Sequence, residues 1–165
     1  SILAPAYNES VTIIENVRSL LTLNYPAFEI VIINDGSSDD SLEKLIATFQ
    51  LKKDTSPHYN FIATAEVKAV YKSQLSSFAS LTVIDKENGG KADALNAGVN
   101  IAEHQLVCCI DVDCILEQDA LVKLVKPFLN STKKKVIAAG GVIRIANSCT
   151  IEDGKLVKVE LPSTL

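Results

Sequence analysis

Short apolar runs alternate with longer segments at helical spacing along this chain, and that alternation restricts the possible folds more than any other feature. Residues 30–33, Ile-Val-Ile-Ile, are apolar without a break, as expected for a strand that is covered on both faces. Buried strands that alternate with helices are typical of βα units in a largely parallel sheet. The sequence therefore predicts an α/β fold with a mostly parallel sheet flanked by helices.

The expected elements follow each other regularly outside one stretch. Strands are predicted at residues 1–4, 28–33, 81–85, 106–111 and 136–145, and helices at residues 11–21, 40–50, 91–103 and 117–129. Residues 51–80 show no clear pattern except a short strand at 68–71. Asp40 and Glu43 have the spacing of a capping box, and Gly140-Gly141 predicts a bulge or a close backbone approach in the last strand.

The composition fits one globular domain over residues 1–165, with 47% hydrophobic and 22% charged residues. A net charge of −4 argues against nucleic-acid binding, which usually needs a basic surface. No apolar run reaches the roughly 18 residues of a membrane span, so this stretch is expected to be soluble. It contains no methionine, as expected for a fragment of a longer protein, although processing or a cleaved tag would have the same result.

The four cysteines form no Cys-x-x-Cys pair, so they are expected to be reduced. Cys108 and Cys109 lie in an apolar segment and are predicted to be part of the core, where a free cysteine behaves as a small hydrophobic residue.

Asp111 and Asp113 stand at the end of the expected strand 106–111. Strand periodicity puts both carboxylates on one side, about 7 Å apart. Two like charges there need compensation, and hard oxygen ligands suit Mg²⁺ or Mn²⁺, which could bridge them to a diphosphate. Alternatively, both face solvent or cap the helix near Glu117, which is the commoner situation for an isolated Asp-x-Asp.

A glycine turn, Asn88-Gly89-Gly90-Lys91, precedes the expected helix 91–103. Glycines allow close backbone approach, and the N–H groups of a helix N-terminus attract phosphate. Lys91 would add a positive charge there. Because the spacing matches neither the P-loop nor the dinucleotide fingerprint, this segment is either another kind of phosphate site or an ordinary connector.

Two more polar segments, residues 5–9 (Pro-Ala-Tyr-Asn-Glu) and 34–39 (Asn-Asp-Gly-Ser-Ser-Asp), follow the first two strands. Open α/β sheets bind ligands at the carboxyl ends of their strands. An aromatic ring with nearby carboxylates could hold a nucleobase there, although the same residue types also serve ordinary turns and helix caps. Four such segments after four strands favour one composite site for a base, a phosphate and a metal.

Taken in order, these four segments resemble the donor-side motifs of family 2 inverting glycosyltransferases with the GT-A fold, a Rossmann-like α/β architecture. The matching segments are residues 5–9, 34–39, 88–91 with 94–96, and 111–113. The resemblance covers most of the chain outside residues 51–80. It implies a UDP-sugar donor, a divalent cation (Mn²⁺ or Mg²⁺), and transfer with inversion to a saccharide or another hydroxyl acceptor.

Carried over by position, the resemblance implies that Ala4, Tyr7 and Glu9 line the uridine site and that Asp35 contacts the uracil or the ribose. Residues 83–98, with 140–144, are similar to the bacterial membrane-embedded branch that builds extracellular polysaccharides. The full-length protein would then act at the cytoplasmic face of the bacterial inner membrane, held there by segments outside this sequence.

The resemblance places Lys91 near the diphosphate, Asp111 near the ribose or the metal, and Asp113 as a metal ligand. The family's Gln-x-x-Arg-Trp segment does not occur up to Leu165, and its general base, an Asp in a Glu-Asp pair, is expected beyond that residue. We therefore expect this fragment to bind donor nucleotide but to transfer sugar poorly or not at all. Arg144 could reach a phosphate or form a surface ion pair.

Two other functions remain open at this stage. One is a non-catalytic module that binds a nucleotide. The other is a nucleotidyltransferase, although its glycine-rich basic loop usually follows the first strand, where this chain has Tyr7-Asn8-Glu9. An oxidoreductase is disfavoured because no dinucleotide fingerprint follows any strand.

Overall fold

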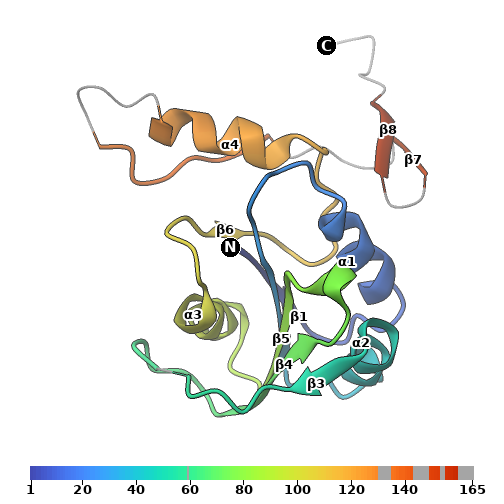
Figure 1. The fold of residues 1–165 in the computed structure, drawn as a ribbon, viewed down its shortest axis with the longest axis vertical. Coiled ribbons are helices and arrows are strands. Elements are labelled where there is room, and N and C mark those ends of the chain that lie inside the picture. The colour runs from blue at the N-terminus through green and yellow to red at the C-terminus, as the bar shows by residue number, and fades with distance from the viewer. Residues whose placement is uncertain (59, 130–134, 143–148, 153–154, 160–165) are drawn as a thin grey trace.

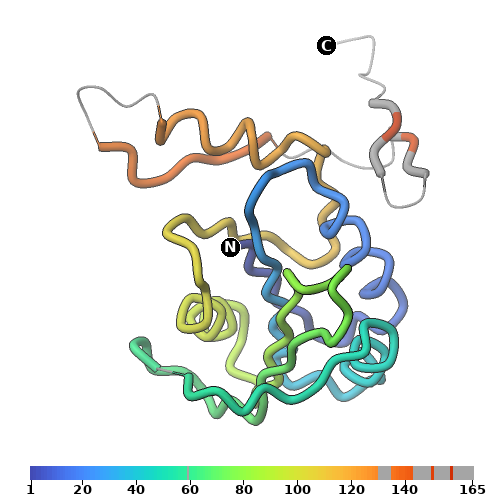
Figure 2. The backbone as a smooth tube through the Cα atoms, viewed as in Figure 1, coloured from blue at the N-terminus to red at the C-terminus, as the bar shows by residue number. Residues whose placement is uncertain are grey.

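The computed structural model describes residues 1–58, 60–129, 135–142, 149–152 and 155–159. Within them, six strands form one sheet in the order β3-β4-β5-β2-β1-β6, and two more form a separate hairpin-like sheet, β7-β8. Figure 1 shows the six-stranded sheet between helices, with α4 and the β7-β8 pair to one side of it. Figure 2 traces the same path as a tube.

The sheet combines a parallel part with an antiparallel edge. The parallel strands are β1 (Ile2–Ala6), β2 (Ile30–Asp35), β5 (Leu81–Lys86) and the two-residue β6 (Cys108–Cys109). The antiparallel strands are β3 (Leu51–Lys53) and β4 (Val67–Ser73), and the separate sheet pairs β7 (Cys149–Glu152) with β8 (Lys155–Val159). The prediction of a mostly parallel sheet flanked by helices is confirmed. The antiparallel edge comes from residues 51–80, where sequence patterns predicted only the short strand at 68–71, which β4 confirms.

Helices cover both faces of the sheet. These helices are α1 (Ile13–Leu21), α2 (Ser41–Phe49), α3 (Lys91–Ile101) and α4 (Ala120–Leu129), with a short 3₁₀ turn at Ser76–Phe78. Strands β1, β2 and β5 send alternate side chains to a core shared with α1 and α2 and to a second core shared with α3. None of the α4 residues is buried.

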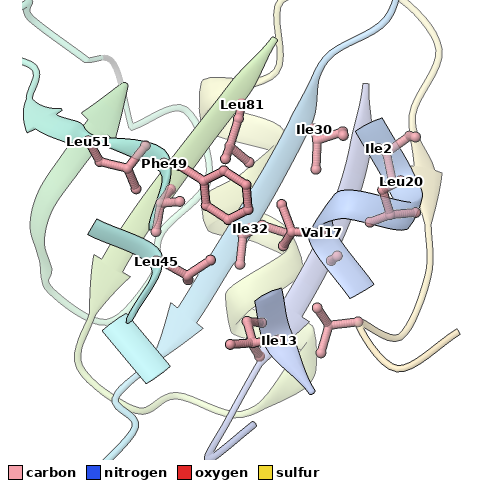
Figure 3. Close-up of a cluster of buried hydrophobic side chains, with 14 of the residues drawn as sticks. Ile2, Ile13, Val17, Leu20, Ile30, Ile32, Leu45, Phe49, Leu51 and Leu81 are labelled. Carbon is pink, nitrogen blue, oxygen red and sulfur yellow. The ribbon is translucent and has the colours of Figure 1, made fainter. Parts of the chain in front are cut away.

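The packing on both faces of strand β2 explains why its sequence is apolar without alternation. Ile30 and Ile32 pack in the cluster with α1 and α2, whereas Val31 and Ile33 pack against α3 on the opposite face. All four side chains are fully buried. Figure 3 shows Ile30 and Ile32 in the first of these layers, beside Val17 of α1.

The start of α2 differs from the capping box predicted at Asp40 and Glu43. The Asp40 side chain makes no capping hydrogen bond. Instead, the Asp39 carboxylate accepts hydrogen bonds from the Ser41 N–H at 3.0 Å and the Ser41 Oγ at 2.5 Å. It also accepts one from the Ser10 N–H at 3.0 Å, so it joins the helix start to the loop after β1.

Three further predictions were wrong in part. The strand expected at 106–111 is only two residues long. Residues 136–142 of the expected last strand form no strand or bulge, and its remainder, like Arg144, lies outside the described residues. Cys109 is exposed rather than buried, because β6 is an edge strand, whereas Cys108 packs at the margin of the core.

Candidate functional site

The polar segments after β1, β2 and β6 and the start of α3 enclose one open pocket of about 250 Å³. Parallel strands bring their carboxyl ends to the same edge of the sheet, where ligand sites form in this class of fold. The pocket is lined by Pro5, Ala6, Tyr7, Glu9, Asp35, Lys91, Asp111, Val112 and Asp113.

Nearly all the site residues predicted from the sequence meet in this pocket. Those lining it are Tyr7, Glu9, Asp35, Lys91, Asp111 and Asp113. Ala4 does not line it, because its side chain is fully buried in the core shared with α1 and α2. Pro5 and Ala6, the next residues along β1, take that place.

Asp111 and Asp113 project into the pocket because the residue between them anchors the segment. Val112 is buried against the core, and the two aspartates on either side of it are exposed. Their carboxylates and the Cys114 thiol can offer ligand atoms within 4.8 Å of one another. Two carboxylate oxygens fit Mg²⁺ or Mn²⁺, which prefer hard ligands and leave room for phosphate oxygens and water, whereas the thiol, which the sequence did not single out, suits softer metals.

Lys91 stands at the first position of α3 and reaches across the pocket. Its Nζ forms an ion pair with the Asp111 carboxylate. The hydrogen bond and the charge of Asp111 raise the pKa of Lys91 above its ordinary value. A protonated lysine and a carboxylate pair therefore stand side by side at one end of the pocket.

The loop after β1 holds Tyr7 and Glu9 by interlocking with the loop after β2. Between them, Asn8 has a positive φ of 56°, and its Oδ1 accepts a 2.8 Å hydrogen bond from the Ser38 N–H. The Glu9 N–H donates to the Ser41 Oγ at 3.0 Å. Tyr7 remains half exposed at the pocket, so its ring face is accessible to a planar ligand.

Asp35 lines the pocket, yet its buried carboxylate accepts hydrogen bonds from other residues of the protein. Oδ1 accepts hydrogen bonds from the Gly89 N–H at 3.0 Å and the Lys86 Nζ at 2.7 Å, and Oδ2 accepts one from the Gly90 N–H at 2.8 Å. The Asp35 carbonyl accepts a 2.7 Å hydrogen bond from the Asn88 Nδ2. Asp35 therefore organises the glycine turn that leads to Lys91.

Two charged residues that sequence reasoning missed lie behind this turn. Lys86 is fully buried at the end of β5 and pairs with Asp35 at 2.7 Å and with Asp93 of α3 at 2.5 Å. Burial alone would lower the pKa of Lys86, but the hydrogen bonds and charges of the two aspartates outweigh it and raise the pKa. The hydrogen bond from Lys86 lowers the pKa of Asp93.

A signal for Lys86 was present in the sequence. Strand alternation puts Lys86 on the same side as Ile84, which is buried against α3. A lysine at such a position requires buried acidic partners.

Comparison with known proteins decides the family. The model of the family described as "Glycosyl transferase family 2" matches residues 1–66 and 63–148. The chain belongs to glycosyl transferase family 2. Membership argues against the nucleotidyltransferase alternative, and the resemblance inferred from the motifs is confirmed.

The chain is similar to named synthases along its whole length. It is 33% identical over 165 residues to a poly-β-1,6-N-acetyl-D-glucosamine synthase of Staphylococcus epidermidis, covering 100% of this chain and 33% of that protein. It is 34% identical over 163 residues to the synthase of the same name from Staphylococcus aureus strain COL, covering 99% of this chain and 32% of that protein. The chain thus spans about a third of the length of these relatives.

Solved structures share the fold. A mannosyltransferase from Pyrobaculum calidifontis, in complex with GDP-Man and Mn²⁺, aligns with a TM-score of 0.58 and 22% identity over 78% of this chain and 32% of that one. TarS 1-349 from Staphylococcus aureus, in complex with UDP-GlcNAc, aligns with a TM-score of 0.54 and 20% identity over 78% of this chain and 31% of that one. These likenesses confirm the predicted GT-A type of fold. Among the described residues, no helix is long and apolar enough to cross a membrane.

Proposed function

We propose that the pocket binds a UDP-sugar together with Mn²⁺ or Mg²⁺ and forms the donor side of an inverting glycosyltransferase that builds a polysaccharide. The observation that supports this most is the meeting of two carboxylates, a lysine and a glycine turn at one pocket. A diphosphate with a bound divalent cation needs this combination of negative ligands and positive charge.

The two ends of the pocket suit the two ends of the donor. We assign Tyr7 and Glu9 to the uridine. The aromatic face of Tyr7 can stack on the base, and the Glu9 carboxylate can accept a hydrogen bond from the base N–H or from a ribose hydroxyl. Asp35 also lines the pocket, and its carboxylate accepts the N–H groups of the glycine turn at the diphosphate end. Lys91 and the start of α3 suit the diphosphate, because a helix N-terminus and an ammonium group both attract anions.

We assign Asp111 and Asp113 to the metal. When bound, a divalent cation supplies charge that stabilises the departing diphosphate. Lys91 already pairs with Asp111, so it can exchange this carboxylate for a phosphate oxygen without leaving the pocket. The general base that deprotonates the acceptor hydroxyl is proposed to come from chain beyond Leu165.

The names of the relatives support a narrower donor. The similar synthases are named for a polymer of N-acetyl-D-glucosamine, and TarS was solved with UDP-GlcNAc. We therefore propose UDP-GlcNAc as the donor and a growing saccharide as the acceptor. We also propose that the full-length protein works at the cytoplasmic face of the bacterial membrane, as in the membrane-embedded branch that its motifs resemble.

Calorimetric titration of UDP into the chain, with and without Mn²⁺, tests this proposal. Wild-type protein is expected to bind UDP more tightly with Mn²⁺, and Asp113→Ala is expected to lose at least about tenfold in affinity, as when a ligand group of a metal site is disturbed. Asp119→Ala is the matched control, because Asp119 is an exposed aspartate that pairs with Lys123 outside the pocket. GDP and NAD serve as competing nucleotides.

Two results would contradict the proposal. One is a UDP affinity that does not change with Mn²⁺ while the protein is folded. The other is equal binding by Asp113→Ala and Asp119→Ala. A comparison of UDP-GlcNAc with UDP-glucose then checks the narrower donor assignment, which requires tighter binding of the acetylated sugar.

A further inference from the structure

We propose that Lys86 is a positioning residue for the diphosphate end of the pocket. It joins Asp35 and Asp93 beneath the Gly89-Gly90 turn, and this buried charge network sets the backbone that faces the phosphates. The inference rests on the proposed function and adds a residue that does not itself line the pocket.

Three protein oxygens surround the Lys86 ammonium group. An ammonium group carries three N–H donors, and the Lys86 Nζ lies 2.7 Å from Asp35 Oδ1, 2.5 Å from Asp93 Oδ1 and 2.6 Å from the Glu87 carbonyl oxygen. Its side chain is 0% exposed, against 5% for Asp35 and 22% for Asp93. Lys86 therefore acts through its partners and not by touching a phosphate.

The first partner, Asp35, holds the turn from below. Its two carboxylate oxygens accept the N–H groups of Gly89 and Gly90. Gly90, the N-cap of α3, has φ 84° and ψ 167°, a region that is essentially limited to glycine and persists only where neighbouring structure enforces it. Because Lys91 follows directly, the direction of its side chain depends on this turn.

The second partner, Asp93, holds the turn from the side of α3. Gly89 lies so close to the Asp93 side chain that a Cβ on the glycine would collide with it. Asp93 Oδ2 also accepts a 2.9 Å hydrogen bond from the Ala65 N–H. Without the ammonium group of Lys86, the buried Asp35 carboxylate loses its charged partner even when Asp93 is neutral, and the hold of Asp35 on Gly89 and Gly90 weakens.

This arrangement predicts a selective effect on ligands. A loosened turn weakens contact with the diphosphate, whereas the base end, carried by the loop after β1, keeps its own hydrogen bonds to Ser38 and Ser41. UDP binding should therefore suffer and uridine binding should not. A general loss of stability would affect both ligands alike.

The main variant is Lys86→Met/Asp93→Asn, which removes one charge of each sign and keeps side chains of similar size. The matched control is Lys68→Met/Glu87→Gln, which removes an exposed ion pair of 2.9 Å on the same part of the sheet. Asp93→Asn alone serves as a milder variant that leaves the Lys86–Asp35 pair intact. Circular dichroism establishes which variants are folded.

The first measurement is amide hydrogen exchange by NMR at Gly89 and Gly90, in protein without nucleotide. Exchange at both amides is expected to be faster by about tenfold or more in the main variant, since it reports local opening, and unchanged in the control. The second measurement is titration with UDP and with uridine. We expect the main variant to lose about tenfold in UDP affinity, equivalent to about 1.4 kcal/mol, and to keep its uridine affinity.

The outcomes separate the two proposals. Unchanged exchange at Gly89 and Gly90 overturns the positioning role, whatever the protein binds. Equal losses of UDP and uridine affinity also overturn it in favour of a general structural role. Wild-type protein that binds neither ligand contradicts the proposed function alone, because the exchange data still test the network. If the main variant does not fold, Asp93→Asn must show the same selective loss in smaller measure.

Discussion

Gly36 offers a sharp test of how the pocket is built, because it connects Asp35 to the rest of the loop after β2. Its φ is +70°, in the left-handed region, and a Cβ built on it would lie 2.7 Å from the backbone nitrogen of Asn88 and 3.0 Å from the Asn88 Cβ. Gly36→Ala therefore combines backbone strain with a collision against a second turn of the site.

The expected cost follows from these two effects. A left-handed conformation costs a non-glycine residue about 1–2 kcal/mol, and crowding in a packed region costs about 1–3 kcal/mol. Alanine also has less conformational freedom than glycine in the unfolded chain, which offsets about 0.4–1 kcal/mol. We expect a net loss of about 3 kcal/mol in the free energy of unfolding.

Urea denaturation measures this loss. With a slope of about 2 kcal/mol per molar urea, the midpoint should fall by about 1.5 M. Gly140→Ala is the matched control, because a Cβ there meets nothing within 4 Å and its φ is not in the left-handed region; its free energy of unfolding should change by no more than about 0.5 kcal/mol. Equal midpoints for the two variants would refute the reasoning and show that the two turns can move apart freely.

Two further predictions concern the core and acid stability. Burial alone would raise the pKa of Asp39, but hydrogen bonds from Ser41 and Ser10 outweigh it and lower the pKa. The stability that Asp39 contributes is therefore present above the ordinary aspartate pKa of about 3.9 and is lost as the pH falls through its lower folded value. Asp39→Asn should lower the urea midpoint at pH 7 but not at pH values below the folded pKa; a constant difference would contradict this. Phe49 is fully buried, and its ring meets that of the half-buried Phe78 edge to face, with 5.1 Å between the ring centroids. Phe49→Ala should therefore lower the free energy of unfolding, measured by thermal denaturation, by about 3–5 kcal/mol, which is more than Phe78→Ala should. A larger loss for Phe78→Ala would count against this description of the core.

Sequence patterns predicted the architecture and most of the pocket because these depend on local features and on the rule that open α/β sheets bind ligands at the carboxyl ends of their strands. The unbroken apolar run of β2 indicates burial on both faces, and the structure confirms it for Ile30 and Val31. The parallel arrangement then brings the strand ends to one edge. Tyr7, Lys91 and Asp113 could be assigned to one pocket for this reason.

Other features depended on contacts that local patterns do not contain. Ala4 follows the motif by position, yet strand alternation turns its side chain into the core. Asp39 rather than Asp40 binds the start of α2 because it can also reach the loop after β1. Strands β3 and β4 extend the sheet antiparallel beyond β5, and they come from a segment whose sequence shows no clear period.

The sequence alone determined the alternation of parallel strands and helices, the glycine turn, and the carboxylates that follow β6. The tertiary structure decided which charges meet behind the pocket. Lys86 lies 51 residues from Asp35 in the chain, and Asp93 belongs to α3, the helix that follows the glycine turn. Their pairing follows from how α3 packs on the sheet, because a buried lysine is tolerated only where folding brings carboxylates to it.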